Sequence, residues 1–109
     1  MARYLIQAAY TADAAAAFAR QPQERETGLR ALLERVGARL ESFDYSLGDY
    51  DVVAIMTAPD NATATAVSLA VQAAGHMTAY KTTPLLSQAE FLEASRQASG
   101  AGYRAPSAG

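Results

Sequence analysis

The stretch SLGDYDVVAI, Ser46–Ile55, decides the fold of this 109-residue chain. Gly48 and Asp49 favour a tight turn, and a run of high β propensity follows from Tyr50 to Thr57. Residues 39–47, before the turn, alternate with Leu40, Ser42 and Asp44 on one side and Glu41, Phe43 and Tyr45 on the other. Two strands joined so closely are antiparallel neighbours, so we predict a hairpin at the centre of the sequence.

Elements on either side of this hairpin alternate between strand and helix. Apolar spacings of three and four predict amphipathic helices over residues 22–36 and 60–74, each followed by a glycine. Apolar runs over residues 3–10 and 76–84 predict the first and last strands. The resulting order βαββαβ is the ferredoxin-like arrangement. We therefore predict an α+β fold with a four-stranded antiparallel sheet.

The two connections outside this core have weaker helical signals. Thr11 opens a short alanine-rich helical turn, and Ser87 with Glu90 forms a capping box for a third helix that extends to about residue 97. After Ser99 the chain is mostly Gly, Ala, Ser and Pro, which offer little apolar surface to bury. We predict one domain over residues 1–97 and a flexible C-terminal tail over residues 98–109.

Composition excludes several classes of site. The chain has no cysteine, so it has no disulfide, cysteine-ligated zinc or thiol nucleophile. A net charge of -2 argues against a nucleic-acid partner. No apolar run approaches the about 20 residues that span a bilayer, and the first residues lack the apolar core of a signal peptide. We expect a cytoplasmic protein without membrane association, and the alanine- and arginine-rich composition indicates a GC-rich bacterial source.

The predicted strands carry more large apolar side chains than helices on one face of a sheet can cover. These residues are Tyr4, Ile6, Tyr10, Phe43, Tyr45, Val53, Ile55, Met77 and Tyr80. A large exposed apolar face is an association site, and its simplest cover is the same face of a second copy. We therefore expect a homodimer or higher homo-oligomer that forms through the sheet face.

Four short segments resemble the GYD-domain family, over residues 3–95. They are Tyr10-Thr11, Pro22 with Arg25, Gly48-Asp49-Tyr50-Asp51-Val52-Val53 at the hairpin, and Ala58-Pro59-Asp60 before the second long helix. The resemblance implies the dimeric α/β-barrel superfamily, in which two ferredoxin-like sheets pack into a barrel. The chain departs from the family pattern at residues 76–81, where we expect a more uniform Thr- and Arg-rich strand, and at Gln21, a poor cap before Pro22.

Two aspartates of the hairpin are candidates for ligand binding. Asp49 and Asp51 lie two residues apart, so in an extended strand their side chains point the same way. A hard cation needs about six oxygen ligands, and the sequence supplies no adjacent cluster, so we predict no metal site. The structural alternative is that Asp49 solvates the turn and Asp51 binds neighbouring backbone N–H groups.

The tyrosines and the single histidine are the other candidates. Candidate catalytic residues are His76, Tyr50 and Tyr80, and candidate ligand-binding residues are Tyr10, Tyr45, Asp49 and Asp51. As an alternative, His76 follows a helix C-terminus and interacts favourably with the helix dipole. The tyrosines, likewise, are suited to core or dimer packing with their hydroxyls hydrogen-bonded.

Function is not decided by any catalytic motif. The sequence has no phosphate-binding loop, nucleophile elbow or zinc-protease motif. We expect a homo-oligomeric α/β-barrel module that binds a small molecule without a cofactor. The alternative is a cofactor-independent oxygenase- or isomerase-like enzyme for a small aromatic or lactone substrate, by analogy with this fold class. A regulatory domain that uses its C-terminal tail is a third possibility.

Overall fold

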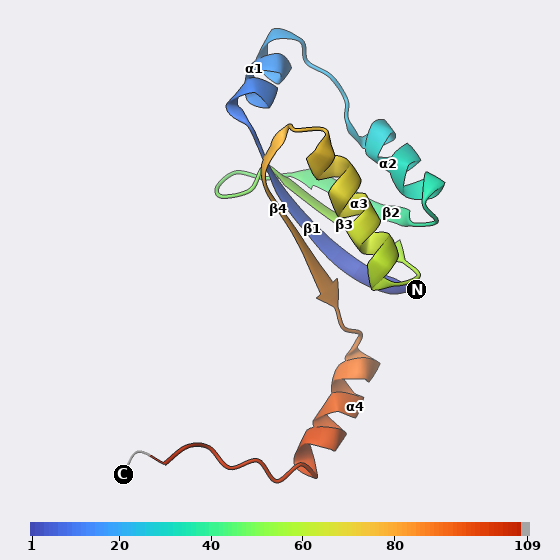
Figure 1. Ribbon diagram of the computed structural model, residues 1–109, viewed down its shortest axis with the longest axis vertical. Helices are drawn as coiled ribbons and strands as arrows, with labels where there is room; N and C mark the ends of the chain where they lie inside the picture. The colour runs from blue at the N-terminus through green and yellow to red at the C-terminus, as the bar shows by residue number, and fades with distance from the viewer. Residues whose placement is uncertain (108–109) are drawn as a thin grey trace.

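The computed structural model describes residues 1–107 (Figure 1). Within them the elements are β1 (Ala2–Tyr10), α1 (Ala12–Arg20), α2 (Glu26–Arg35), β2 (Arg39–Tyr45), β3 (Val52–Ala58), α3 (Asn61–Ala73), β4 (Met77–Leu85) and α4 (Gln88–Ser99). All neighbouring strands are antiparallel, and the sheet order is β2-β3-β1-β4. This is the ferredoxin-like topology, so the predicted α+β fold is confirmed.

Helices α2 and α3 pack against one face of this sheet. Leu33 of α2 and Val67 of α3 are fully buried against Tyr4, Ile6 and Met56 from the central strands. Burial alternates along β3, where every second residue from Val52 to Ala58 is buried and those between are half-buried. The core therefore lies between the sheet and the two helices.

The opposite face of the sheet carries fewer apolar residues than the sequence suggested. Tyr4 and Ile6 are buried beneath the helices, and Phe43 and Tyr80 pack against the same core. The residues left on the other face include Leu5, Val53 and Ile55, with Leu5 directly opposite Ile55 across the β1–β3 ladder. The aromatic side chains thus belong to the helix side, and the uncovered face is mainly aliphatic.

A bulge in β2 decides which of its residues face the helices. Leu40 pairs with Met56 and Ser42 with Ile55, so Glu41 is an extra residue without a partner on β3. Because of this extra residue, Leu40 and Phe43 both point to the helix side although they are three positions apart. Simple alternation placed them on opposite sides, and the bulge explains why neither predicted side was cleanly polar.

A second irregularity lies between β1 and β4. Ala9 pairs with Ala79 and Tyr10 with Met77, so Thr78 is the extra residue. The Thr78 hydroxyl donates to the Ala9 carbonyl at 3.4 Å. This shift brings Met77 beside Tyr10 on the helix side, at the end of the sheet that also carries the loop between β2 and β3.

The hairpin that contains the Gly48-Asp49 turn has a longer loop than predicted. Strand β2 ends at Tyr45 and β3 begins at Val52, so residues 46–51 form the loop, with Gly48 at φ 117°. Asp51 anchors this loop, since its Oδ2 accepts the Tyr10 N–H at 2.9 Å and its own N–H donates to the Ala8 carbonyl at 2.8 Å. The structural alternative for Asp51, binding to backbone N–H groups, is therefore what the structure shows.

Two predicted helix starts agree with the structure, and one does not. Thr11 caps α1 by accepting the Ala14 N–H at 3.1 Å, and Asp60 caps α3 by accepting the Thr63 N–H at 2.8 Å. The predicted start at Pro22 is wrong, because α2 begins at Glu26. The N-cap residue Arg25 makes no side-chain capping hydrogen bond, although Glu24 Oε1 accepts the Thr27 N–H at 2.6 Å. Residues 21–25 are an irregular connection that leads from α1 to α2.

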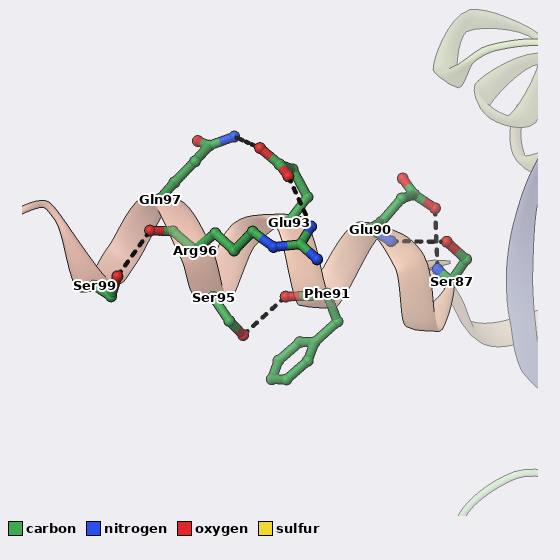
Figure 2. Close-up of polar contacts among 8 residues, drawn as sticks. All are labelled: Ser87, Glu90, Phe91, Glu93, Ser95, Arg96, Gln97 and Ser99. Atoms are coloured by element: carbon green, nitrogen blue, oxygen red, sulfur yellow. Dashed lines mark hydrogen bonds and ion pairs between the residues drawn. The ribbon is translucent and has the colours of Figure 1, made fainter.

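Helix α4 lies beyond the end of β4, away from the sheet (Figure 1). None of its residues is buried, and the longest dimension of the molecule is 59 Å. Figure 2 shows the predicted capping box, in which Glu90 N–H donates to Ser87 Oγ and Ser87 N–H donates to Glu90 Oε1, both at 3.0 Å. Phe91 projects to the other side of the helix from the Glu93 contacts and is 66% exposed (Figure 2).

The predicted boundary between domain and tail stays a prediction. Helix α4 continues to Ser99, and residues 108–109 of the expected tail lie outside the described residues. Within residues 1–107, no helix combines the length and hydrophobicity needed to span a membrane.

Candidate functional site

A cavity of about 270 Å³ lies between the sheet and helices α2 and α3. Its walls are largely apolar and include Leu29 and Leu32 of α2 and Val71 of α3. Small residues at Gly28, Ala70 and Ala74, together with Ala8 on the sheet, line the same space. Because these positions have little or no side chain, α2 and α3 leave a void toward one end of the sheet.

Tyr80 lines this cavity, and its hydroxyl is buried in the interior without a hydrogen-bond partner among the described residues. The neighbouring Thr82 hydroxyl is also buried and unpartnered. Burial raises the pKa of Tyr80 to about 12, an effect that Thr82 opposes. Tyr80 is therefore a neutral phenol at physiological pH and is available as a hydrogen-bond donor.

An aromatic cluster closes the end of the cavity at the termini of β1 and β4. The Tyr10 ring lies 4.9 Å from the Phe18 ring at 58°, and 6.1 Å from the His76 ring at 29°. Burial, and then the nearby Tyr45, raise the pKa of Tyr10 to about 12. The cluster thus presents uncharged, stackable rings to the cavity.

His76 is placed at this end by the start of β4. Its carbonyl accepts the Thr11 N–H at 3.0 Å, which ties the beginning of α1 to the beginning of β4. Burial lowers the pKa of its imidazole below the ordinary value of 6.5, and the positive charge of Arg25 lowers it further. A neutral imidazole can accept a proton or hydrogen-bond a ligand near pH 7.

The structure brings some of the sequence-predicted residues together and separates others. Tyr10, His76 and Tyr80 line the same cavity. Tyr45 lies just outside it, in a shallower hollow that it shares with Arg25 and Phe43. The predicted site residues in the hairpin loop do not line the cavity. These residues are Asp49, Tyr50 and Asp51.

The roles of those loop residues follow from their positions. Asp49 is exposed, whereas Asp51 is engaged with the backbone of β1. The Tyr50 carbonyl accepts the Ser46 hydroxyl at 2.6 Å. Among residues 1–107, no three His, Cys, Asp or Glu side chains are grouped so that they could hold a metal ion.

Two arginines of the site were missed as candidates. Arg25 and Arg35 line the cavity from the two ends of α2. From the sequence, Arg25 was singled out only within a family-like segment, and Arg35 was not singled out. The signal that could have found them is the helix face that they share with Gly28, since a small residue on the apolar side of an amphipathic helix marks space beneath it.

Comparison with known proteins supports a single family assignment. The family model of the GYD domain matches residues 4–95. Neither a curated protein nor a solved structure matches the sequence. The matched region extends from β1 into α4 and includes the hairpin, the cavity and the residues that line it. The chain therefore belongs to the GYD-domain family.

Proposed function

We propose that this protein is a small-molecule-binding module whose ligand occupies the cavity between the sheet and helices α2 and α3. The observation that carries the proposal is the buried, unpartnered hydroxyl of Tyr80. A buried polar group without a partner costs about 1–3 kcal/mol. An acceptor atom of a ligand beside Tyr80 would remove that cost and gain a hydrogen bond.

The composition of the cavity wall supports the same proposal. Ligand sites are commonly apolar hollows with a few polar groups that fix orientation, in volumes of about 300–1,000 Å³. The cavity here has about 270 Å³ and presents Tyr80 and His76 within mostly apolar walls. Its size suits a ligand at the small end of that range.

The proposal is tested with a thermal-shift screen of small aromatic compounds and lactones on wild-type protein, Tyr80→Phe and Tyr103→Phe. Tyr103 is 85% exposed and undergoes the same chemical change, so it is the matched control. We expect at least one compound to raise the melting temperature of the wild type and the control, and to raise that of Tyr80→Phe less. If no compound stabilises the protein, or if Tyr80→Phe responds like the wild type, the proposal fails.

We further propose that the protein self-associates through the sheet face opposite the helices. Neither α2 nor α3 covers Leu5, Val53 and Ile55 on that face. Burial of aliphatic surface stabilises association by about 25 cal/mol per Å² before the entropy of association is subtracted. Because the cavity opens on the helix side, two copies joined in this way would each keep their own site.

Sedimentation of three proteins tests the self-association. We expect the wild type to sediment as a dimer or larger at micromolar concentration, and Ile55→Asp as a monomer. Ala66→Asp, on the exposed surface of α3, introduces the same charge on the helix side and should keep the wild-type assembly. A monomeric wild type, or an Ile55→Asp variant that still associates, would contradict the proposal.

The second candidate function is cofactor-independent catalysis, of an oxygenase or isomerase type. The observation that favours it is His76, because a partly buried imidazole with a lowered pKa is suited to take a proton from a bound substrate. Mass spectrometry of each bound compound after incubation tests this candidate. Catalysis is supported if the wild type converts a compound that His76→Gln binds but does not convert. If every compound stays unchanged, the protein binds its ligand without catalysis.

A further inference from the structure

The charged side chains that face the cavity all carry the same sign. Among the described residues that line it, Arg25 and Arg35 are charged and no aspartate or glutamate is present. The whole chain has a net charge of -2, so this positive lining is a local property rather than a result of composition. A hollow with low-dielectric walls and one sign of charge concentrates ligands of the opposite sign.

Neither of these two guanidinium groups is neutralised by a neighbouring carboxylate. The ion pairs found within residues 1–107 use other arginines, namely Arg3 with Glu41, Arg30 with Glu26, and Arg96 with Glu93. Both arginines are exposed, so their guanidinium donors are open to solvent and available for a ligand.

Three carboxylates near Arg25 already have partners, and a fourth, Asp44, lines the outer hollow together with Arg25. Glu24 accepts the Thr27 N–H at 2.6 Å, and this hydrogen bond lowers its pKa. Glu26 is 2.7 Å from Arg30. On the sheet side, Asp51 accepts the Tyr10 N–H at 2.9 Å. Among the described residues, these three acids thus have partners other than Arg25, and Asp44 forms no ion pair with it.

Arg25 is also positioned over the cavity rather than away from it. A Cβ atom built on Gly28 would lie 3.9 Å from Arg25 Nη2, so the guanidinium folds back over the first turn of α2. Its charge acts on groups within the site, because it contributes to the lowered pKa of His76 and opposes the raised pKa of Tyr10. One cationic donor and two aromatic rings therefore lie at one end of the cavity.

We propose that the ligand of this cavity is a small carboxylate with an apolar body, held at its carboxylate by Arg25. The inference rests on the small-molecule-binding function proposed above. The planar guanidinium fork matches the geometry of a carboxylate. The apolar body lies between Leu29, Leu32 and the sheet, and the Tyr80 hydroxyl donates to a second oxygen or nitrogen of the ligand.

The volume limits the size of that body. A cavity of about 270 Å³ equals the share of roughly nine water molecules in the liquid. A single ring or a short alkyl chain fits this space, whereas a nucleotide or a fatty acid does not. Free phosphate would use Arg25 but leave the apolar walls unoccupied, so we favour the carboxylate over an inorganic anion.

Pairs of probes that share a shape but differ in charge test whether the cavity prefers a carboxylate. Benzoate and hexanoate are compared with benzamide and hexanamide, their neutral counterparts, and with inorganic phosphate, by titration of the backbone amide NMR signals. We expect the carboxylates to shift the signals of cavity residues and to bind about tenfold more tightly than the amides, the gain of one charge-assisted hydrogen bond. Phosphate should shift fewer cavity signals and bind more weakly than either carboxylate.

Variants then test the assignment to Arg25. In Arg25→Gln the carboxylates should bind no more tightly than their amides, whereas Arg20→Gln, on the exposed surface of α1, should keep the preference. Equal binding of acids and amides by wild type would overturn the carboxylate class but preserve the binding function. A preference that survives Arg25→Gln would overturn the role of Arg25, and no cavity shift with any probe would overturn both proposals.

Discussion

Two tyrosines on the same face of the sheet have opposite environments. Tyr4 of β1 is 2% exposed, and its hydroxyl donates to Asn61 Oδ1, at the start of α3, at 2.6 Å. Tyr80 of β4 also packs against the core, but its hydroxyl has no partner among the described residues. Both rings pack against the core, Tyr4 fully buried and Tyr80 half-buried, and only the Tyr4 hydroxyl has a partner among the described residues.

We call the end of the sheet near Tyr4 the structural end and the end near Tyr80 the cavity end. Near Tyr4 the fold supplies its own hydrogen-bond partner, Asn61, beside a hollow of about 280 Å³ that both residues line. Tyr80 lines the other cavity together with Gly28, Ala70 and Ala74, and its hydroxyl has no partner among the described residues. A satisfied hydroxyl in one place and an unsatisfied one in the other favour the Tyr80 end as the place for the ligand proposed above.

The largest expected effect comes from the structural end. Tyr4→Ala removes a fully buried ring together with its bond to Asn61, so we expect a loss of about 3–5 kcal/mol in the free energy of unfolding. Urea denaturation measures it, with Tyr103→Ala, at an exposed position, as the control that should change little. A loss below about 1 kcal/mol for Tyr4→Ala would mean that this end of the sheet is not the structural centre.

The next effect concerns the loop between β2 and β3, residues 46–51. Asp51→Ala leaves the Tyr10 N–H without its acceptor, so we expect a loss of about 1–3 kcal/mol, the cost of an unsatisfied backbone donor. Asp49→Ala, in the exposed part of the same loop, is the matched control and should be nearly neutral. Equal effects of the two substitutions in urea denaturation would show that the bond from Tyr10 to Asp51 contributes little.

Particular residues show which features of the fold can be predicted from the sequence. Asp60, Ser87 and Gly75 carry local signals, since a cap or a left-handed glycine needs only its neighbours in the chain. These positions and the order of the elements agree with the prediction. Local signals also explain the error at Pro22, which is suited to a helix start but lies in the irregular connection before Glu26.

The candidate site was predicted less completely, because it depends on contacts between distant segments. His76, Tyr10 and Tyr80 were named from their chemistry, and they do line one cavity. The sequence could not show that bulges at Glu41 and Thr78 turn Phe43 and Met77 toward the helices, since a bulge is set by pairing with another strand. Nor could it show that Arg25 lies over the cavity.

A smaller effect, with opposite signs at the two ends, tests the comparison directly. Tyr4→Phe removes a satisfied hydroxyl, so we expect it to destabilise the ligand-free protein by about 1 kcal/mol. Tyr80→Phe removes an unsatisfied hydroxyl, so we expect it to stabilise the ligand-free protein by up to about 1 kcal/mol. Urea denaturation of both variants measures the two signs, and a destabilised Tyr80→Phe would show that its hydroxyl is satisfied in solution.

The smallest effect is a pH dependence that belongs to the cavity end. The folded pKa of His76 lies below 6.5 because burial and Arg25 disfavour the imidazolium. Between that folded pKa and the unfolded value of about 6.5, the unfolded chain binds more protons than the native one. The free energy of unfolding therefore rises with pH through this window, and the contribution of His76 is lost as the pH falls.

Comparison of wild type with His76→Asn isolates this contribution from the carboxylates that also titrate in acid, among them Glu24, Asp60 and Glu90. Urea midpoints at about pH 5.5 and pH 7.5 should differ more for the wild type than for the variant. NMR titration of the imidazole gives the pKa itself, and a value above 6.5 would contradict the effect of Arg25. Added benzoate should raise the pKa, because a carboxylate bound at Arg25 replaces a positive neighbour of His76 with a neutral pair.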